Sequence, residues 1–569
     1  MYFLALAADY DGTIADHGFV NAATAEALKR FKGTGRRLIL VTGREIADLT
    51  HAFAELKIFD LVVAENGAVI YEPANESERV IAPAPSARLV EKLMERKVEP
   101  ISVGRSIIAT WAPHQAAVLS AIQELGLESQ IIFNKGAVMV LPAGVNKASG
   151  LKAALSMLDI AVHNVIAVGD AENDHTFLGL CGCAAAVANA LPAIRDEADI
   201  KLSGDHGAGV VELIQKVIRE DARIIPPSRH GILVGTDRSG QKVYLEPDCR
   251  VLIAGESESG KSMFATLLTE RMAEKQFEFC VIDPEGDYEG LRHAVCIGRD
   301  CTSPTTEEAL TLVCETGVNL VINTVALNMS DRQRLFASLI GPMAELRART
   351  GRPHWLLVDE AHQVLSAATG QPWHHLLKGL PATIFITVSP EFLAADLLRT
   401  IDVVLVFGRA ALKAVATIAK ALNMPAVSPD TMTLADDEIV LWSPRSGQPL
   451  SAVRVEAPRQ DHKRHTGKYA VGDVGERESF YFRGPRNALN LRAPNLLRFL
   501  EIAQEVDDAT WEFHLRAKHY SAWFRYIIKD EELAAETAQI EADAGLDPRE
   551  SRARVRQAVF QRYVAPGQG

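Results

Sequence analysis

The sequence predicts an α/β protein of several domains, in which helices cover parallel sheets and a small helical module follows. Two observations lead to this fold class. Short apolar runs alternate with helical stretches up to about residue 222 and again after residue 229, and this alternation is typical of parallel sheets. From residue 478 onward, apolar and aromatic residues instead recur at helical spacing. We expect an α/β domain at residues 1–222 with an inserted cap at about 73–145, a second α/β domain at 223–457, a linker at 458–477 and a helical module at 478–569.

The composition is that of an ordinary globular protein. Of the 569 residues, 48% are hydrophobic and 23% are charged. The net charge of −13 argues against non-specific nucleic-acid binding by the whole surface, although a local basic channel stays compatible with it. The seven cysteines form no paired CxxC motifs, which indicates reduced thiols in a cytoplasmic protein. The apolar start is too short for a signal peptide, and no apolar run is long enough for a membrane span.

The first domain is organised around Asp9-Tyr10-Asp11-Gly12-Thr13, which follows an apolar run at residues 2–8. Because side chains alternate along a strand, Asp9 and Asp11 point the same way at the strand end. One carboxylate can attack phosphorus to form an aspartyl phosphate, and the other can give a proton to the leaving oxygen. The alternative interpretation is an acidic turn after a strand.

Further polar residues follow later predicted strands of this domain. They are Thr42-Gly43-Arg44 after the strand at 37–41, Glu65-Asn66-Gly67 after 61–64, and Asp170 and Asp174 after 165–168, while Lys147 opens a helix. Parallel α/β sheets bind ligands at the carboxyl ends of their strands. Residues 86–141 are predicted to form helix, two strands, helix and two strands, a small α+β insert.

These motifs resemble those of the haloacid dehalogenase (HAD) superfamily, and in particular its Cof-type phosphatases, whose cap lies between the second and third motifs. The resemblance implies a Rossmann-like core, Mg²⁺, and a phosphorylated small molecule or nucleic-acid end as the substrate. It implies Asp9 as the nucleophile, Asp11 as the general acid/base, Thr42 and Lys147 as groups that stabilise the phosphoryl oxygens, and Asp9, Asp11 (through its carbonyl), Asp170 and Asp174 as metal ligands.

Three more residues are candidates for substrate binding, namely Asn66, Gly67 and Arg44. For Asn66-Gly67 a hairpin turn is an equal alternative, and Arg44 is also suited to capping a helix. The small cap and Tyr10 resemble those of sugar-phosphate and phosphoglycolate phosphatases, which does not define the substrate.

The second domain carries a complete GxxxxGK[ST] loop between a strand and a helix, Gly255-Glu256-Ser257-Glu258-Ser259-Gly260-Lys261-Ser262. Backbone N–H groups of such a loop cradle the phosphates of ATP, Lys261 reaches the β/γ-phosphates and Ser262 binds Mg²⁺. A later strand ends at Asp359-Glu360. We expect Asp359 to hold the water shell of Mg²⁺ and Glu360 to polarise the attacking water. This carboxylate pair favours hydrolysis over kinase chemistry.

Together with Asp283-Pro284-Glu285-Gly286-Asp287-Tyr288, these motifs make residues 229–457 similar to the HerA/FtsK-type ATPases. That resemblance implies ATP as the ligand and a homo-oligomer, for which a hexameric ring is one form. The strand at 382–389 lacks the glutamine usual in these motors, so Thr387 and Ser389 are the candidate γ-phosphate sensors. Arg399 and Arg409 are candidates for an arginine finger.

We therefore expect a cytoplasmic, bifunctional enzyme without a membrane partner, in which the ATPase regulates or powers a phosphatase. Two alternatives remain open. The first is a nucleic-acid end-processing enzyme that joins the phosphatase to a polynucleotide kinase or a DNA-stimulated ATPase. The second is a nucleotide-switched scaffold. The C-terminal module is expected to serve packing or partner binding.

Overall fold

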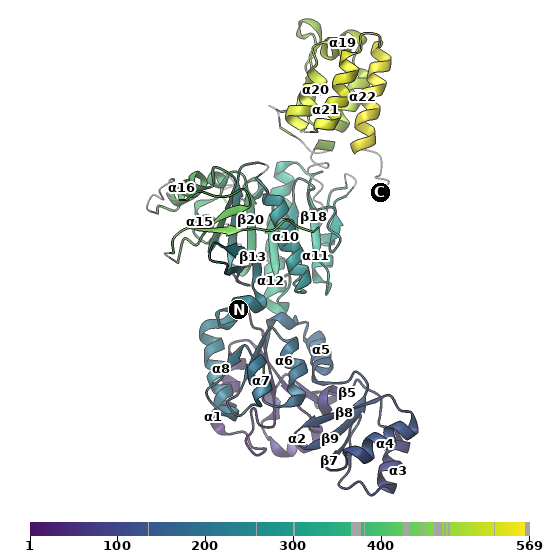
Figure 1. Ribbon diagram of the computed structural model, residues 1–569, viewed down its shortest axis with the longest axis vertical. Coiled ribbons are helices and arrows are strands. Elements are labelled where there is room, and N and C mark those ends of the chain that lie inside the picture. The colour runs from purple at the N-terminus through teal and green to yellow at the C-terminus, as the bar shows by residue number, and fades with distance from the viewer. Residues whose placement is uncertain are drawn as a thin grey trace. The chain divides into compact units, whose positions relative to one another are not determined.

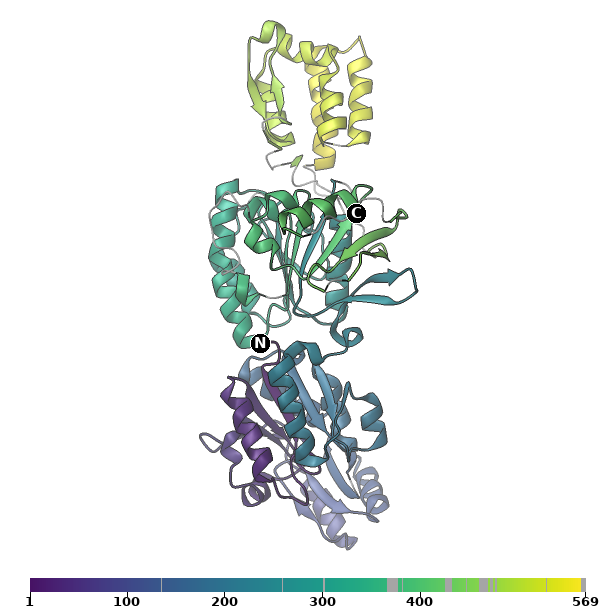
Figure 2. The same cartoon turned by 90° about the vertical axis from the view of Figure 1, so that its left-hand side faces the viewer.

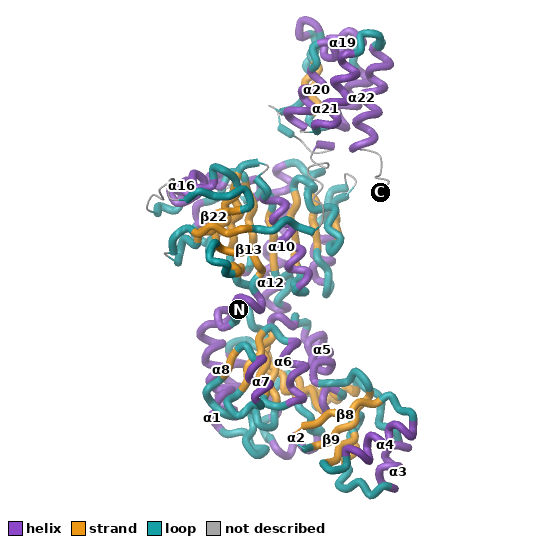
Figure 3. Tube along the Cα trace, in the orientation of Figure 1, coloured by secondary structure: helices purple, strands orange, loops and turns teal. Residues whose placement is uncertain are grey.

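The computed structural model describes residues 1–134, 136–257, 259–299, 302–365, 377–380, 382–424, 432–446, 448–459, 469–470, 474–475, 478–528 and 530–563. The chain divides into two compact units (Figure 1). Unit 1 consists of residues 1–231 with 246–248 and 346–352, and unit 2 consists of the remaining residues. Both contain a central sheet, as the strands in Figure 3 show. The α/β fold class predicted from the sequence is therefore confirmed.

The main sheet of unit 1 has the strand order β12-β11-β10-β1-β2-β3-β4-β5. Pairing is parallel from β12 to β3, and β4 and β5 extend the sheet in antiparallel fashion. Its strands are β1 (Ala5–Asp9), β2 (Arg37–Val41), β3 (Leu61–Ala64), β4 (Val69–Glu72), β5 (Ser77–Val80), β10 (Val165–Gly169), β11 (Cys183–Ala186) and β12 (Ile200–Lys201). The chain moves to one side of β1 through β2 and β3 and to the other side through β10 and β11. Right-handed crossovers therefore put the connecting helices on opposite faces.

The helices of unit 1 cover these two faces (Figure 2). Helix α1 packs beside α8, and α5 packs beside α6. Asn21 caps α1, because its side chain accepts a hydrogen bond from the Thr24 N–H (2.8 Å). The helices are α1 (Ala22–Gly33), α2 (Ile46–Ala52), α5 (Lys147–Leu158), α6 (His175–Leu180), α7 (Pro192–Glu197), α8 (His206–Glu220) and α9 (Pro227–His230), with 3₁₀ turns at Leu56–Ile58, Glu65–Gly67, Val162–Asn164, Glu172–Asp174 and Asp221–Ile224.

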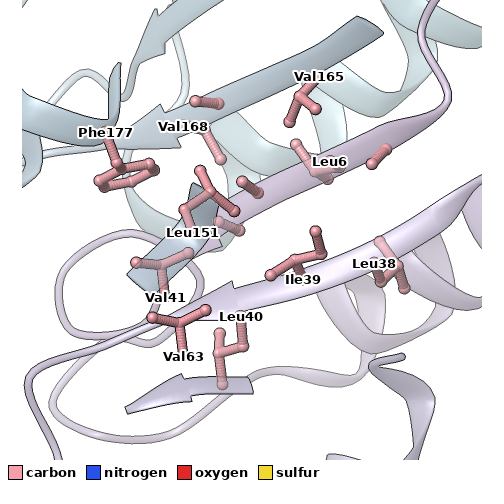
Figure 4. Close-up of a cluster of buried hydrophobic side chains, with 14 of the residues drawn as sticks. Leu6, Leu38, Ile39, Leu40, Val41, Val63, Leu151, Val165, Val168 and Phe177 are labelled. Carbon is pink, nitrogen blue, oxygen red and sulfur yellow. The ribbon is translucent and has the colours of Figure 1, made fainter. Parts of the chain in front are cut away.

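The hydrophobic core of unit 1 lies between the sheet and its helices (Figure 4). Strand β1 is buried along its whole length, as expected for a strand with parallel neighbours on both sides and helices on both faces. Leu151 of α5 and Phe177 of α6 pack against the strand side chains. This packing positions the polar residues that follow the strand ends.

The inserted cap of unit 1 is a separate antiparallel sheet with the order β6-β7-β9-β8. Its elements follow the predicted order of helix, two strands, helix and two strands, and they pack around a core of their own. They are α3 (Ala87–Glu95), β6 (Ser102–Val103), β7 (Ile108–Trp111), α4 (Gln115–Leu125), β8 (Ser129–Asn134) and β9 (Ala137–Pro142).

The sheet of unit 2 has the order β14-β13-β23-β22-β21-β15-β20-β19-β16-β18-β17. Pairing is parallel from β21 to β17 and antiparallel from β22 to β14. Its strands are β13 (Ile232–Asp237), β14 (Lys242–Leu245), β15 (Arg250–Gly255), β16 (Phe279–Asp283), β17 (Val295–Ile297), β18 (Leu320–Asn323), β19 (Trp355–Val358), β20 (Thr383–Thr387), β21 (Val403–Phe407), β22 (Glu438–Trp442) and β23 (Ser451–Arg454).

Strand β15, which leads into the GxxxxGK[ST] loop, lies between β20 and β21 in this sheet. The helices around it are α10 (Lys261–Glu274), α11 (Thr306–Cys314), α12 (Met329–Thr350), α13 (Ala361–Val364), α15 (Ala395–Leu398) and α16 (Ala411–Ala421), with 3₁₀ turns at Leu377–Gly379 and Pro390–Phe392. None of the helices in the described part of the chain combines the length and the apolar character needed to cross a membrane.

The C-terminal module begins with a hairpin, not with the helix expected from residue 478. Strand β24 (Phe480–Phe482) pairs antiparallel with β25 (Leu491–Ala493). Aromatic residues favour a strand here, and Gly484-Pro485 interrupts any helix. A 3₁₀ turn at Pro485–Asn487 and the helices α18 (Leu496–Glu505), α19 (Asp508–Arg516), α20 (His519–Trp523), α21 (Glu531–Ala542) and α22 (Pro548–Tyr563) complete the module, with a π-helical turn at Phe524–Ile528.

The aromatic residues of this module form its core, as the sequence predicts. Trp511 stacks on Tyr520 with 4.4 Å between ring centroids, and Phe499 stacks on Trp523 at 5.3 Å. His514 lies among these rings. Its Nε2 accepts the backbone N–H of Arg483 (3.0 Å), and its Nδ1 lies 2.9 Å from Nδ1 of His519. Burial, together with the charges of His519 and Arg483, lowers the pKa of His514 to about 4.

We predict that acidification destabilises this module through His514. The folded module keeps His514 neutral down to pH of about 4, whereas the unfolded chain takes up a proton near pH 6.5, so stability is lost as the pH falls from 6.5 toward 4. The loss reaches roughly 2–3 kcal/mol at the acidic end. This loss of stability is measured by urea unfolding at pH 7.5 and at pH 5. Hydrogen exchange in peptides from α19 and α20 reports the unfolding of this module. His514→Gln keeps an acceptor oxygen and does not titrate, so the variant should lose this pH dependence; equal pH dependence in both proteins contradicts the assignment.

Candidate active sites

The first site lies where several parallel strands of unit 1 end. Asp9 is the last residue of β1, Thr42 follows β2, Glu65 follows β3 and Asp170 follows β10. Lys147 is the first residue of α5, whose start is fixed by a capping box between Asn146 and Ser149. The sheet therefore brings together residues that are far apart in the sequence.

Lys147 is the centre of this site. Its side chain is 1% exposed, and its Nζ lies 2.5 Å from Oδ1 of Asp9 and 2.6 Å from Oδ1 of Asp174. Burial alone would lower the pKa of Lys147, but the two carboxylates raise it, so the ammonium group stays charged. The pKa of Asp9 is raised by burial and by the charge of Asp174, and Lys147 counteracts this increase.

The acidic residues next to Lys147 form a set of ligands suited to Mg²⁺. Asp9, Asp170 and Asp174 are buried, and each offers a carboxylate oxygen within 4.8 Å of the others. Oδ1 of Asp170 accepts a hydrogen bond from the Thr13 hydroxyl (3.0 Å). Oδ2 of Asp174 accepts the backbone N–H groups of Asp170 (2.8 Å) and Ala171 (2.9 Å). Carboxylate oxygens are what Mg²⁺ requires, so the residues fit this ion, and the fixed Asp174 orients the loop that carries Asp170.

Asp11 and Arg44 form an ion pair beside this cluster. Nε and Nη2 of Arg44 each lie 2.7 Å from an oxygen of Asp11, and Nη1 lies 2.9 Å from Asp48. The hydrogen bond with Asp11 and the nearby carboxylates raise the pKa of Arg44. Arg44 also lies 5.0 Å from the centre of the Tyr10 ring. Arg44 does not cap α2, because the residue at that position is Glu45.

Thr42, Asn66 and Gly67 support the site from the neighbouring strand ends. Oγ1 of Thr42 accepts the Arg44 N–H (3.1 Å), which leaves the hydroxyl hydrogen able to donate. Asn66 and Gly67 do form the turn between the antiparallel strands β3 and β4. Oδ1 of Asn66 accepts a hydrogen bond from Asn173 (2.9 Å), while its Nδ2 reaches Met139 of the cap. Gly67 has φ +105°, and a Cβ there would lie 2.0 Å from the carbonyl oxygen of Asn146, so this position requires glycine.

Glu65 is not among the predicted site residues, yet it connects the core to the cap. Its buried carboxylate accepts three backbone N–H groups of the turn before β7, from Arg105 (2.9 Å), Ser106 (2.8 Å) and Ile107 (3.2 Å). A Cβ at Gly104 would lie 2.8 Å from this carboxylate. The only hint in the sequence is its position directly before Asn66-Gly67 at a strand end. Glu65 thus holds one turn of the cap at the edge of the site.

We predict that Glu65→Gln loosens the cap. The amide NH₂ cannot accept an N–H bond, and a charge-assisted hydrogen bond contributes about 1.5–3 kcal/mol. We expect KM for a phosphomonoester to rise about tenfold or more, with a smaller change in kcat. Steady-state kinetics and hydrogen exchange at residues 104–107 measure both effects. Glu76→Gln is the matched control, since Glu76 is exposed. If hydrogen exchange and KM are both unchanged in Glu65→Gln, the hydrogen bonds between Glu65 and the cap do not contribute to substrate binding.

The second site is the loop between β15 and α10 in unit 2. Gly260 has φ +99° at the helix start, and Nζ of Lys261 lies 2.7 Å from the Glu256 carbonyl, curled back over the loop. Gly255 packs so closely that a Cβ would lie 2.6 Å from the Phe407 carbonyl oxygen. Ser257 is exposed and Ser262 is half-buried, while Glu258 lies outside the described residues. The strand–loop–helix context expected for a phosphate-binding loop is therefore present.

Asp359 and Glu360 follow β19, which is separated from β15 by β20. Burial and the charges of Glu360 and Asp287 raise the pKa of Asp359. Nδ1 of His362 lies 3.2 Å from Oε2 of Glu360 and 3.1 Å from Oγ1 of Thr387 at the end of β20. His362 was not predicted, although it comes two residues after Glu360 in the sequence. It links the expected catalytic carboxylate to one of the two candidate sensors.

The motif at residues 283–288 forms a loop held by its own first side chain. The carboxylate of Asp283 accepts backbone N–H groups of Glu285, Gly286, Asp287 and Tyr288, at 2.7–3.2 Å. Burial and the charge of Asp287 raise the pKa of Asp283 to about 7 although these bonds oppose the shift. Asp283 therefore organises the loop.

The chain therefore combines an α/β domain that carries an acidic cluster suited to a metal ion with an α/β domain that carries a strand–loop–helix motif of the phosphate-binding type. Residues 6–110 and 114–214 match the family of haloacid dehalogenase-like hydrolases, and residues 231–352 match the central domain of helicase HerA. A phosphoglycolate phosphatase of Methanothermobacter thermautotrophicus is 32% identical over 222 residues, 37% of this chain and 97% of the relative. Phosphoglycolate phosphatase 2 of Saccharolobus solfataricus is 29% identical over 220 residues, 37% of this chain and 91% of the relative.

A crystal structure of a haloacid dehalogenase-like hydrolase from Bacteroides thetaiotaomicron aligns with a TM-score of 0.34 at 18% identity, covering 38% of this chain and 99% of that chain. Through residues 6–214 the chain belongs to the haloacid dehalogenase-like hydrolases. It is a phosphatase of this class that also carries a HerA-type P-loop ATPase domain. Both family resemblances expected from the sequence are confirmed.

Proposed function

We propose that the N-terminal domain is a Mg²⁺-dependent phosphomonoester hydrolase that works through a phosphoaspartyl enzyme. The observation that carries the proposal is the buried Asp9 carboxylate, held 2.5 Å from the Lys147 ammonium group at the end of β1. Asp9 is positioned as a nucleophile, with a fixed positive charge beside the place where a phosphoryl group would lie. Asp11 lies two residues further on, where it can serve proton transfer.

In the proposed reaction, an oxygen of Asp9 forms a bond to phosphorus while the bond from phosphorus to the leaving oxygen breaks. Asp11 gives that oxygen a proton, and in the second half it takes a proton from the water that attacks the aspartyl phosphate. Lys147 and the Thr42 hydroxyl stabilise the equatorial oxygens. Mg²⁺ held by Asp9, Asp170, Asp174 and the Asp11 carbonyl would offset the repulsion between carboxylate and phosphate.

The ion pair between Asp11 and Arg44 suggests how substrate binding and proton transfer are connected. Both oxygens of Asp11 accept hydrogen bonds from Arg44, so Asp11 must leave Arg44 before it donates a proton. A substrate with its own carboxylate would compete for Arg44 and release Asp11. The relatives named phosphoglycolate phosphatases support such a substrate, and we propose a small phosphorylated acid.

Replacement of the nucleophile tests this proposal. Asp9→Asn should lower kcat for phosphoglycolate and for p-nitrophenyl phosphate by about 10³-fold or more, because an amide cannot form the phosphoenzyme. Phosphate release with MgCl₂, and again after EDTA, measures the loss and the metal dependence. Asp16→Asn is the matched control, since this nearby side chain is 62% exposed. Full activity in Asp9→Asn, or activity that EDTA leaves intact, would refute the mechanism.

We further propose that the second domain hydrolyses ATP, with phosphates on residues 255–262, Mg²⁺ at Ser262 and Asp359, and the attacking water at Glu360. The arrangement that supports this is the P-loop on β15 with the Asp359-Glu360 pair two strands away. We also propose that the domain forms a homo-oligomer and regulates or powers the phosphatase. The match to helicase HerA favours a second candidate, an ATPase stimulated by DNA.

The two hydrolytic sites can be separated in the Asp9→Asn background. There, Lys261→Ala should abolish ATP binding, whereas Glu360→Gln should keep binding and slow hydrolysis by about 10²-fold or more. ATP binding by calorimetry and phosphate release, with and without DNA, measure these effects, and mass photometry gives the oligomeric state. Loss of ATP hydrolysis on Asp9→Asn alone would assign the turnover to the phosphatase site. Stimulation by DNA would select the nucleic-acid motor.

A further inference from the structure

The hairpin that opens the C-terminal module has a charge distribution unlike that of the whole chain. Residues 479–500 contain four arginines and no aspartate or glutamate, in a chain whose net charge is −13. This segment includes β24, β25 and the turn between them. A net negative charge repels polyanions, so a local positive segment decides where such a partner can approach the protein.

Two arginines of this hairpin carry charges that no acidic side chain balances. In the helical part of the module that the structure describes, six arginines each form an ion pair with an aspartate or glutamate, as Arg516 does with Glu512. Arg483 and Arg486 are exposed and form no ion pair with any of the described residues. Their guanidinium groups are therefore able to bind an anionic partner.

An aromatic ring lies beside arginines on the solvent side of the hairpin. Side chains alternate along a strand, so the buried rings of Phe480 and Phe482 leave Tyr481 and Arg483 on the opposite face. The guanidinium carbon of Arg483 lies 5.4 Å from the centre of the Tyr481 ring. Arg492 is the cross-strand partner of Tyr481 and shares this face. The hairpin thus presents a half-buried ring next to two arginines.

The turn between the two strands is held in place and exposes further polar groups. The backbone N–H of Arg483 donates to Nε2 of the buried His514 (3.0 Å), which fixes the start of the turn on the core of the module. Arg486 and Asn487 both have a left-handed backbone, with φ +62° and +53°. The side chains of Arg486, Asn487 and Asn490 lie exposed. The turn therefore adds a cation and two amides to the solvent side of the module.

These groups match the chemistry of a single-stranded nucleic acid. Arginine binds a phosphate through paired N–H donors, and an aromatic ring gives a base a surface on which to stack. The amide of asparagine offers the donors and the acceptor that a base edge requires. In a duplex the bases stack on one another, so a ring such as Tyr481 is used by a strand whose bases are exposed.

We propose that this hairpin binds single-stranded nucleic acid, with a base stacked on Tyr481 and phosphates at Arg483, Arg486 and Arg492. The surface lies outside residues 6–214 and 231–352, which match the two families. It therefore adds a binding function to the two proposed hydrolytic activities, and it requires neither ATP nor a phosphatase substrate.

Binding of a labelled oligothymidine to the full chain, without ATP, tests this proposal. Fluorescence anisotropy over a series of salt concentrations gives the affinity for the single strand and for the same strand in a duplex. Arg483→Gln/Arg486→Gln should bind the single strand at least about tenfold more weakly. The dependence of log Kd on log salt should also become shallower by about 1.4, since each phosphate contact of a single strand contributes about 0.7.

Removal of the ring tests the stacking step separately. Tyr481→Val keeps a residue that suits a strand and loses the aromatic surface. We expect this variant to bind the single strand about tenfold more weakly with an unchanged salt dependence, because no phosphate contact is removed.

The matched control is Arg516→Gln/Arg554→Gln. It removes the same charge from the same module, but from arginines that pair with Glu512 and Glu550, so its affinity should equal that of the wild type. Circular dichroism shows whether each variant is folded. The losses in the hairpin variants, together with wild-type affinity in the control, support the proposal.

Four results would each overturn the proposal. They are no binding of the single strand by the wild type, tighter binding of the duplex, wild-type affinity in the folded hairpin variants, and displacement of the oligonucleotide by polyglutamate as effectively as by unlabelled strand. The third result would place nucleic-acid binding elsewhere in the chain, and the fourth would make the hairpin a site for acidic proteins. None of them affects the proposed phosphatase and ATPase, which are measured by phosphate release.

Discussion

The buried ion pairs of Lys147 are the constraint on which unit 1 depends. A lysine that is 1% exposed must be paired, and here it contacts Asp9 and Asp174. Removing one member of a buried ion cluster leaves an uncompensated charge and is strongly destabilising. The cluster therefore fixes three segments to one another: the end of β1, the start of α5 and the loop after β10. The same ion pairs hold the Asp9 carboxylate next to the Lys147 ammonium group. The interaction that holds the three segments together therefore also positions the reactive groups of the candidate site.

Close backbone packing makes this arrangement available. Gly67 and Gly150 approach each other so closely that a Cβ on Gly150 would lie 2.4 Å from Cα of Gly67. This contact brings α5 against the hairpin turn after β3, and the capping box at Asn146 sets where the helix begins. Gly169 likewise leaves room for the carboxylate of Asp174, 2.6 Å from the position of a Cβ. Because these glycines have no side chain, backbone segments and charged groups can approach them closely. This close approach matters more at the site than the flexibility of glycine.

The two sites handle charge differently. In unit 1 a permanent internal cation, Lys147, balances the acidic residues. In unit 2, Lys261 is 2.7 Å from a carbonyl of its own loop, whereas Asp283 and Asp359 are buried carboxylates with raised pKa values. Binding of a cation together with a nucleotide would favour the ionised forms of these groups. His362 contacts both Glu360 and Thr387, so it links the end of β19 to the end of β20, the strand that lies between β19 and the P-loop strand.

The sequence by itself determined the fold class, the two family resemblances and the residues that follow the strand ends. It could do so because alternating strands and helices and short motifs such as 9–13 and 255–262 are local patterns with a direct physical meaning. The hairpin at Phe480–Phe482 and Leu491–Ala493 was missed, because aromatic residues suit both a strand and a helix core until a partner strand is known. Only the tertiary structure decided that Arg44 pairs with Asp11, that Glu65 holds the cap and that His362 joins Glu360 to Thr387. These contacts join residues that lie up to 42 positions apart in the sequence, as Glu65 and Ile107 do. Local sequence patterns do not indicate which residues so far apart come into contact.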